Sequence, residues 1–351
     1  MVVEQKLGVG QYGQVFRIKT EDQRVAVKVF YDVAFVPEHP EILPYEICNE
    51  LNTMKRVNHP NVMGILKELD WRGRRGFPCV YMIFMELMEG GDLVHAIYST
   101  TEPFTPHKAV IFTLQLLQGL HHLHDVCAIA HRDLKPGNIL VNGTNLKISD
   151  FGASREANAV LSLDAYTSGG ACTMWYRSPE HALEYPELPF SLDIWSFGCI
   201  VWEMAFQWPL FYCKNSDEVS MLMNVFNLLG TPNEDTWPGI SSAPHYQECF
   251  PKFPQAYIEH RFDTQNMDPY MLFIIIHSVC MYPGDRLPIL DQYMAVKDAI
   301  SKPTDEERLN IFRSLYDTRS AQRDQRANDA AKRAEQAKLA AERAEQAMQA
   351  P

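Results

Sequence analysis

The stretch 131–138 constrains what this chain can fold into more than any other part of its sequence. It places a carboxylate, an ammonium group and a carboxamide within six positions, on Asp133, Lys135 and Asn138. A proline and a glycine between them exclude a regular helix and favour a tight loop. Phosphoryl transfer needs this combination, because a carboxylate orients the attacking hydroxyl group, a cation holds the γ-phosphate and a neutral oxygen binds magnesium. A polar surface turn would explain one of these residues but seldom all three in this order.

The N-terminal region has the alternating pattern of a β-sheet. Three short strands are expected, at residues 4–8, 14–19 and 24–30. Three glycines lie between the first two strands: Gly8, Gly10 and Gly13. Glycines let a hairpin tip approach phosphates with its backbone N–H groups free to donate. Alone this pattern is weak, since ordinary turns and dinucleotide-binding loops share it. A Rossmann unit, however, would continue into a helix, whereas here a strand follows and the next strand carries Lys28.

Four further elements are expected in the middle of the chain. A helix is expected at residues 45–57, and a strand at 80–85 with a connector at 86–93. A second helix follows at 107–124 and a small hairpin at 139–148. Asp150, Phe151 and Gly152 follow the hairpin. An aspartate beside a glycine is usually only a turn, but twelve residues after Asn138 this one supplies a second oxygen ligand suited to a hard cation.

Together these motifs resemble those of the eukaryotic protein kinases. The resemblance covers about residues 4–300 and rests on the glycine loop, the Val-Ala-Val-Lys strand ending at Lys28, the loop at 131–138, and Asp150-Phe151-Gly152. It implies an α+β, bilobal kinase fold: a small β-rich N-terminal lobe with one regulatory helix, a large and mainly α-helical C-terminal lobe, and a helical tail. The corresponding boundaries are expected at 1–86, 87–302 and 303–351.

The resemblance also implies a role for each polar residue. Asp133 would accept the substrate hydroxyl proton and Lys135 would steady the γ-phosphate. Glu50 would pair with Lys28 and place the lysine on the α- and β-phosphates. It is chosen over Glu46 because of its distance from the His-Pro-Asn segment after the helix. Asn138 and Asp150 would hold Mg²⁺. The other expected contacts to ATP are Leu7, Gly8, Gly10, Gly13, Val15, Ala26, Glu86, Met88, Asp92 and Leu140.

Three segments resemble the cyclin-dependent kinases in particular, at residues 44–50, 228–240 and 250–253, and residues 173–180 resemble the group that contains the cyclin-dependent and mitogen-activated kinases. This likeness implies a serine/threonine kinase that acts on Ser/Thr-Pro sites, with Arg177 helping the activation segment to accept the proline. It also implies a cyclin-like activator on the helix that carries Glu50. Glu180 would form a bridge with Arg286 that locks the segment in place.

The sequence departs from that subfamily in its regulatory residues. Counting from Thr173 places the activating phosphate on Ser168, with Thr167 adjacent. Arginines should grip such a phosphate, because bidentate guanidinium pairs order a loop. Asn49 occupies the position of one of these arginines. Whether a phosphate on this segment is coupled to the helix is therefore open. Inhibitory phosphorylation at Tyr12 is also open, because Gln11 precedes it where these kinases have threonine.

Charge and composition exclude several other classes. The net charge of −12 disfavours nucleic-acid binding. The apolar stretches are too short and interrupted to span a membrane, and the N-terminus lacks a secretory pattern. Eight cysteines without a Cys-x-x-Cys pair indicate reduced thiols, hence a cytoplasmic or nuclear protein. The Ala-, Glu- and Arg-rich tail predicts a solvated or partner-stabilised helix. The alternative function is a pseudokinase scaffold, and the physiological substrate stays open.

Overall fold

The structure is a computed structural model, and it divides into two compact units. It describes residues 1–10, 13–31, 45–70, 79–157, 171–186, 188, 190–214, 217–258, 262 and 266–348. The first unit comprises Met1–Thr173 with Glu203–Trp208, and the second comprises Met174–Trp202 with Pro209–Pro351.

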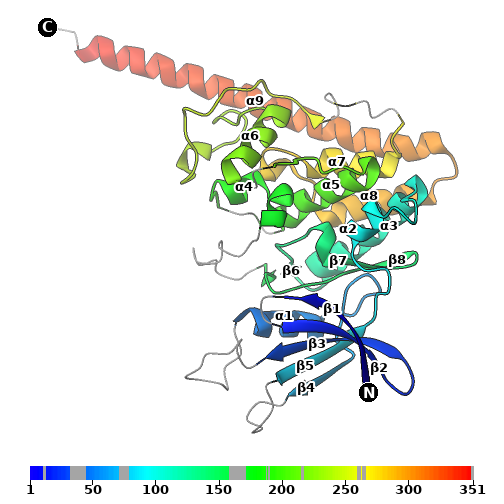
Figure 1. Cartoon of the computed structure of the whole chain (residues 1–351). Helices are drawn as coiled ribbons and strands as arrows, with labels where there is room; N and C mark the ends of the chain where they lie inside the picture. The colour runs from blue at the N-terminus through cyan, green and yellow to red at the C-terminus, as the bar shows by residue number, and fades with distance from the viewer. Residues whose placement is uncertain are drawn as a thin grey trace, which may run out of the picture. The chain divides into compact units, whose positions relative to one another are not determined.

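The first unit begins with a five-stranded antiparallel sheet in the order β1-β2-β3-β5-β4 (Figure 1). Its strands are β1 (Val2–Val9), β2 (Gly13–Lys19), β3 (Arg24–Tyr31), β4 (Lys67–Asp70) and β5 (Cys79–Glu86). The valines of β3 pack with Ile18 and Phe84 into a buried cluster, as the period-two pattern of that strand predicts. The expected strands are all present and each is one to three residues longer. Strand β4 was not predicted, because Lys67, Glu68 and Asp70 leave it almost without apolar residues.

Helix α1 (Tyr45–Arg56) lies beside this sheet (Figure 1). Ile47, Leu51 and Met54 are its buried apolar residues, with exposed fractions of 0%, 4% and 3%. They recur at three- and four-residue steps, so they form one stripe of an amphipathic helix. The helix that the sequence predicted over residues 45–57 is therefore confirmed, and its apolar stripe determines which polar residues face inward.

Two further helices follow in the first unit. Asp92 and Thr105 cap α2 (Leu93–Tyr98) and α3 (Pro106–His121) by accepting from the backbone N–H groups of His95 and Lys108. The second helix does not continue regularly to residue 124, as the sequence predicted. It widens into one π-helical turn over His122–Val126, where the N–H of Cys127 donates to the carbonyl of His122.

Two small hairpins complete the first unit. Strand β7 (Ile139–Asn142) pairs with β8 (Asn145–Ile148), and β6 (Ile129–Ala130) pairs with β9 (Arg155–Glu156). The segment after α1 joins this region to the sheet, since the backbones of Asn61 and Met63 exchange hydrogen bonds of 2.9 and 2.8 Å with Ile148. The loop at 131–138 lies between β6 and β7, so paired strands hold both of its ends.

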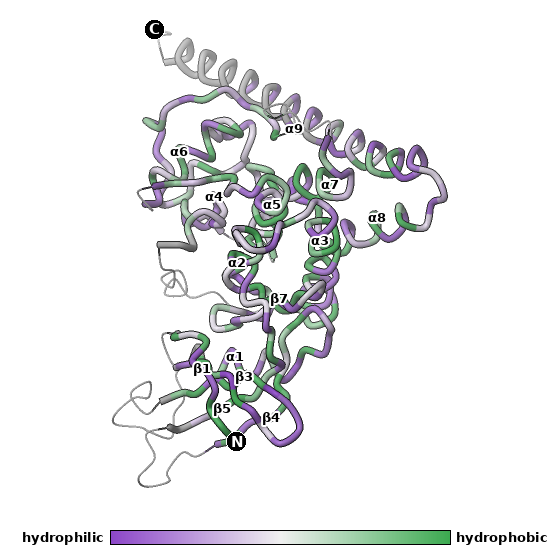
Figure 2. The backbone as a smooth tube through the Cα atoms, turned by 45° about the vertical axis from the view of Figure 1, so that its right-hand side comes forward, coloured by the Kyte–Doolittle hydropathy of each residue, from purple (hydrophilic) through white to green (hydrophobic). Residues whose placement is uncertain are grey.

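The second unit is helical. Its helices are α4 (Pro179–Ala182), α5 (Ser191–Phe206, whose last turn belongs to the first unit), α6 (Glu218–Leu229), α7 (Pro269–Ser278), α8 (Ile289–Ser301) and α9 (Asp305–Met348). Helix α5 is hydrophobic over most of its length (Figure 2). Trp195 and Phe197, on this helix, are fully buried, and Trp195 stacks on Phe211 with 5.3 Å between ring centroids. An apolar helix with buried aromatic residues forms the centre of this unit.

The tail forms the long helix α9, but its first part is not a solvated helix. Phe312 is buried and stacks on Phe273 of α7, with ring centroids 4.5 Å apart. Further along α9, Arg326 pairs with the carboxylate of Asp285 at 2.7 Å and lies over the ring of Tyr282. The helix therefore packs on its own chain through these side chains. Among the described residues, no helix combines the length and the apolar character needed to cross a bilayer.

Candidate active site

Lys28 on β3 and Glu50 on α1 form the ion pair that the sequence predicted. The Nζ atom of Lys28 lies 2.6 and 2.7 Å from the two carboxylate oxygens of Glu50. Burial lowers the pKa of Lys28, but the carboxylates of Glu50 and Asp150 outweigh this effect and hold the pKa above its usual value. The ammonium group is therefore charged at neutral pH. Because Asp150 acts on Lys28, the strand, the helix and the segment after β8 meet at one place.

The loop between β6 and β7 brings its three predicted residues together around one carboxylate. Oδ2 of Asp133 accepts from Nζ of Lys135 at 2.7 Å and from Nδ2 of Asn138 at 3.0 Å. Nδ2 of Asn138 also donates to the backbone oxygen of Asp133 at 2.8 Å. No donor from the described residues reaches the buried Oδ1 atom of Asp133. A buried carboxylate oxygen without a donor is suited to accept from a bound hydroxyl group.

His131 anchors this loop and is itself fully buried. Its Nε2 lies 2.9 Å from the backbone oxygen of Ser149, and its Nδ1 accepts from the backbone N–H of Asp133 at 3.3 Å. These two partners assign the proton of a neutral ring to Nε2. The ring also packs on Phe151, with centroids 5.3 Å apart. One side chain thus connects the loop at Asp133 to the segment around Asp150, a role that the sequence analysis did not assign.

The two expected magnesium ligands lie at the same end of the β7-β8 hairpin. Ile139 pairs with Ile148, and both the N–H and the hydroxyl group of Ser149 donate to the backbone oxygen of Asn138, at 2.8 and 2.9 Å. The hairpin register therefore holds Asp150 near Asn138. The amide nitrogen of Asn138 is engaged by Asp133, which leaves the amide oxygen as its metal-binding atom. One exposed carboxylate and one amide oxygen fit a hard cation that keeps water and phosphate ligands.

The glycines of the β1-β2 hairpin differ in what requires them. A Cβ atom on Gly13 would overlap the backbone carbonyl of Val29, so close packing of β2 on β3 excludes any side chain there. A Cβ atom on Gly8 would meet nothing within 4 Å, and one on Gly10 only the carbonyl of Gly13, at 3.8 Å. Of the three, Gly13 is therefore the one that strand packing requires, and the N–H of Gly10 donates to the carbonyl of Gly13 at 2.8 Å. Strand register places Val15 opposite both Gly8 and Lys28.

The connector after β5 runs beside the β7-β8 hairpin. Backbone hydrogen bonds of 2.9 and 2.8 Å join Gly90 and Gly91 to Val141, and Asp92 forms an antiparallel bridge with Leu140. The expected adenine and ribose contacts from these two segments are thus adjacent. Asp92 also has a structural role, because one of its oxygens caps α2. The remaining expected contacts of this region are Glu86, which pairs with Lys147 at 3.1 Å, Met88, which is buried, and Ala26, which lies opposite Met85.

Asn49 occupies the position where the resemblance leads one to expect arginine, and the structure gives it partners of its own. Its Nδ2 atom lies 3.0 Å from the carbonyl oxygen of Phe151 and 2.5 Å from that of Ser154. The hydroxyl groups of Thr53 and Ser154 are 2.9 Å apart. The sequence analysis missed this cluster. The only local signal is that Asn49 and Thr53 are four residues apart, so they lie on one face of α1.

In the second unit, Glu180 and Arg286 form the predicted bridge, and both side chains are fully buried. Arg177 pairs with Glu218 at the start of α6. Trp175 donates from Nε1 to the carbonyl of Cys213 at 3.1 Å. Buried and half-buried polar contacts thus hold residues 175–180 in the second unit. The expected phosphorylation sites Ser168, Thr167 and Tyr12 lie outside the described residues.

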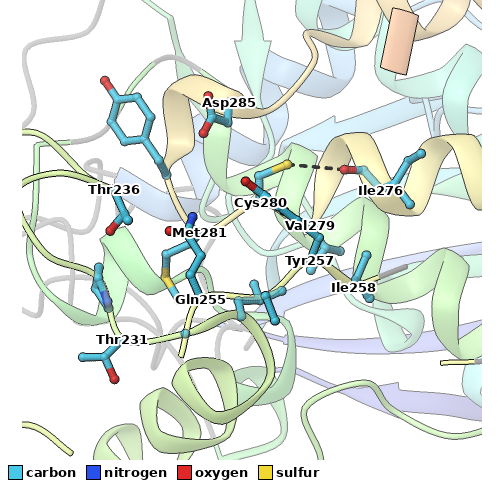
Figure 3. A pocket seen from close by; sticks show the side chains of 15 residues that line it. Thr231, Thr236, Gln255, Tyr257, Ile258, Ile276, Val279, Cys280, Met281 and Asp285 are labelled. Atoms are coloured by element: carbon cyan, nitrogen blue, oxygen red, sulfur yellow. Dashed lines mark hydrogen bonds between the residues drawn. The ribbon is translucent and has the colours of Figure 1, made fainter. Parts of the chain in front are cut away.

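A small pocket of the second unit lies between the segment after α6 and the turn after α7 (Figure 3). Its volume is about 40 Å³, which suits little more than a water molecule. Asp285 is part of its lining, yet that carboxylate already pairs with Arg326. The six cysteines whose surroundings are described form no disulfide bond. Neither this pocket nor the cysteines form a second candidate ligand site beside the one around Asp133.

Comparison with known proteins identifies the family. The family model described as "Protein kinase domain" matches residues 1–292. Cyclin-dependent kinase G1 of Arabidopsis thaliana is 36% identical over 260 residues, which cover 73% of this chain and 41% of that protein. Cyclin-dependent kinase 11B of Homo sapiens is 35% identical over 287 residues, covering 80% and 34%. Cyclin-dependent kinase 2 of Caenorhabditis elegans is 34% identical over 252 residues, covering 71% and 65%. The chain thus spans between about a third and two thirds of these relatives.

A solved structure shares the fold. The CAK complex from Chaetomium thermophilum bound to ATP-γ-S contains a chain that matches with a TM-score of 0.69 at 22% sequence identity. The match covers 84% of this chain and 89% of that one. At this identity the match concerns the fold alone, and it agrees with the five-stranded sheet and helical remainder described above. The expected α+β kinase fold is therefore confirmed.

Proposed function

The chain belongs to the protein kinase family, and we propose that it is a serine/threonine kinase that transfers the γ-phosphate of ATP to a protein hydroxyl group. The observation that carries this proposal is the Asp133 carboxylate. One of its oxygens accepts from Lys135 and Asn138, whereas the other is buried and no described donor reaches it. A buried acceptor that has no donor requires an explanation, and a general base that takes the proton of a substrate hydroxyl group supplies one.

In this proposal each residue of the cluster has one task. Asp133 orients the hydroxyl group and accepts its proton as the oxygen attacks the γ-phosphorus, and the bond from the γ-phosphorus to the bridging oxygen of ADP breaks. Lys135, 2.7 Å from Asp133, steadies the transferred phosphate. Lys28, which Glu50 holds in position, binds the α- and β-phosphates. The hairpin that carries Gly8 and Gly10 would cover the phosphates.

Asn138 and Asp150 would hold Mg²⁺, which supplies charge neutralisation at the phosphates when it is bound. Both are oxygen ligands, and the geometry of the hairpin keeps them together. The adenine ring would contact Leu7, Val15, Ala26, Met88 and Leu140, with Asp92 at the ribose. The bridge between Asp92 and Leu140 and the register of β2 with β3 support this assignment, since they place these residues on adjoining segments.

The substrate and the activating partner follow from the likeness to cyclin-dependent kinases. We assign Ser/Thr-Pro sequences as targets, with Arg177 shaping the segment that accepts the proline. We further propose that a cyclin-like protein binds helix α1, because a partner that displaces this helix would also displace Glu50. None of the described residues argues for the alternative of a catalytically inert scaffold.

The experiment is phosphotransfer by the purified full-length chain from γ-labelled ATP to paired peptides that differ only in Ser-Pro against Ser-Ala. Labelling of the Ser-Pro peptide that requires Mg²⁺ and disappears in Asp133→Asn is the expected result. Equal labelling of both peptides would remove the proline preference and leave the activity. If neither peptide nor any protein is labelled, with or without a co-purified partner, the proposed function is wrong.

A further inference from the structure

Asn49 contacts the segment after Asp150 through hydrogen bonds that involve no charged group. An asparagine amide has two N–H donors. Nδ2 of Asn49 lies 2.5 Å from the carbonyl oxygen of Ser154 and 3.0 Å from both the carbonyl oxygen of Phe151 and the hydroxyl oxygen of Ser154; the carbonyl of Gly152 lies at 3.3 Å. All three carbonyls belong to the backbone that follows Asp150. The side chain of α1 therefore binds the main chain next to the proposed magnesium ligand.

The hydroxyl groups complete the same cluster. Ser154 Oγ donates to the carbonyl of Phe151 at 2.7 Å, so its proton is committed and its lone pairs are left to accept. Thr53 Oγ1, 2.9 Å away, then donates to Ser154 Oγ. Ser154 is fully buried and Thr53 is 5% exposed. Breaking a buried hydrogen bond is costly because it leaves a polar group without water, so the contact resists separation.

Helix α1 makes a second contact with the region after Asp150, and this contact is an exposed ion pair. Arg56, at the end of the helix, pairs with Glu156, and their side chains are 45% and 66% exposed. Exposed ion pairs contribute little, since solvent screens them and ordering long side chains costs entropy. The cluster of half-buried Asn49 with buried Thr53 and Ser154 is therefore the stronger of these two contacts between the helix and the region after Asp150.

We propose that Asn49, Thr53 and Ser154 form a positioning cluster that holds α1, and with it Glu50, in the paired position without a phosphate on the segment 158–170. This inference rests on the proposed kinase function and adds its regulation. A guanidinium group at position 49 would need an anion to order it, whereas a neutral amide finds complete partners in backbone carbonyls. Glu50 is the next residue to Asn49 and three residues before Thr53, so a displacement of this face displaces the carboxylate from Lys28.

The test uses the phosphatase-treated full-length chain and hydrogen exchange measured by mass spectrometry. Asn49→Ala and the near-isosteric Thr53→Val should each speed exchange in peptides that cover residues 150–157 by roughly tenfold, as expected for the loss of about one net hydrogen bond. Asn52→Ala is the matched control, because it removes an exposed asparagine from the same helix. It should leave exchange in these peptides as in the unsubstituted chain.

The kinetic readout separates positioning from a merely structural role. In the phosphatase-treated chain, Asn49→Ala should lower kcat by roughly tenfold. When Glu50→Gln is already present, Asn49→Ala should lower kcat further by less than about twofold. The effects of two substitutions that break the same contact are not additive. Phosphatase treatment of the unsubstituted chain should change kcat by less than about twofold.

Three results would overturn the inference. They are unchanged exchange in both variants, equal acceleration by Asn52→Ala, and faster exchange at residues 150–157 in the unsubstituted chain once phosphate is removed. Failure of the kinase function is a different outcome. If no variant transfers phosphate, the exchange data still decide whether the cluster holds the helix.

Discussion

The amide nitrogen of Asn138 donates both to the backbone oxygen and to Oδ2 of Asp133, at 2.8 and 3.0 Å. The contact with Oδ2, an oxygen that also accepts from Lys135, orients the carboxylate, and the contact with the backbone oxygen ties Asn138 to the main chain. The same contacts orient the asparagine and turn its amide oxygen away from the aspartate. One interaction therefore positions both the proposed base and a proposed metal ligand.

Replacing Asp133 by Asn should lower kcat by about three orders of magnitude, because the interaction with the hydroxyl proton is used mainly in the transition state. ATP affinity should stay nearly unchanged, since no nucleotide contact is lost. Steady-state phosphotransfer and calorimetric ATP titration measure the two effects. Asp125→Asn, which removes an aspartate that pairs with His121 on the same unit, is the matched control. Undiminished phosphotransfer in Asp133→Asn would exclude this residue from the mechanism.

Replacing Glu50 by Gln should reduce kcat/KM for ATP by roughly ten- to a hundredfold, because Lys28 then loses the carboxylate that orients it. The substitution keeps the shape of the side chain, so the stability of α1 should change little. Glu68→Gln is the control, since its partner Lys55 is about half exposed and such pairs contribute little. Equal effects of both substitutions would show that the Lys28 pair has no special role.

Replacing Glu180 by Gln should destabilise the protein by about 3–5 kcal/mol, because it leaves the fully buried guanidinium group of Arg286 without a counter-charge. Denaturant unfolding followed by tryptophan fluorescence gives this difference. Asp298→Asn, which removes the partner of Lys302 from an exposed pair, should cost less than about 1 kcal/mol. A similar loss in both variants would contradict the weight assigned to burial.

Acidification should destabilise the first unit through the stacked rings of His59 and His122, which lie 5.1 Å apart. Each ring accepts a backbone N–H, from Asn61 at 3.1 Å and from Asn58 at 3.3 Å respectively. Burial, followed by neighbouring charge, holds the pKa of both histidines below the ordinary 6.5. The unfolded chain therefore binds protons first as the pH falls.

It follows that this contribution to stability is present above pH 6.5 and is lost as the pH falls below it, toward the lowered pKa. The thermal unfolding midpoint, recorded from pH 7.5 to about 5, should fall less in His122→Gln, which keeps an acceptor but does not titrate. His107→Gln controls for removal of an exposed histidine. A pH profile of His122→Gln that matches the unsubstituted chain would contradict the prediction.

Much of the site was predictable because its signals are local. The alternation of valines defines the strand of Lys28, the apolar stripe defines the helix of Glu50, and the unusual composition of the loop points to Asp133 without any knowledge of the fold. Local signals failed where an element has no pattern of its own. Strand β4 is almost entirely charged, and the π-helical turn at His122–Val126 follows a helix whose apolar spacing continues into it.

The sequence by itself determined which residues could carry phosphoryl transfer and where most of the strands and helices lie, because residue type and spacing act over a few neighbouring positions. Only the tertiary structure decided what Asn49 does. From the sequence it is a missing arginine, whereas in the fold it binds carbonyls 102 and 105 residues away. Every residue has a backbone carbonyl, so no sequence pattern identifies which carbonyls Asn49 binds. Only the folded structure, which brings the two segments together, shows these partners.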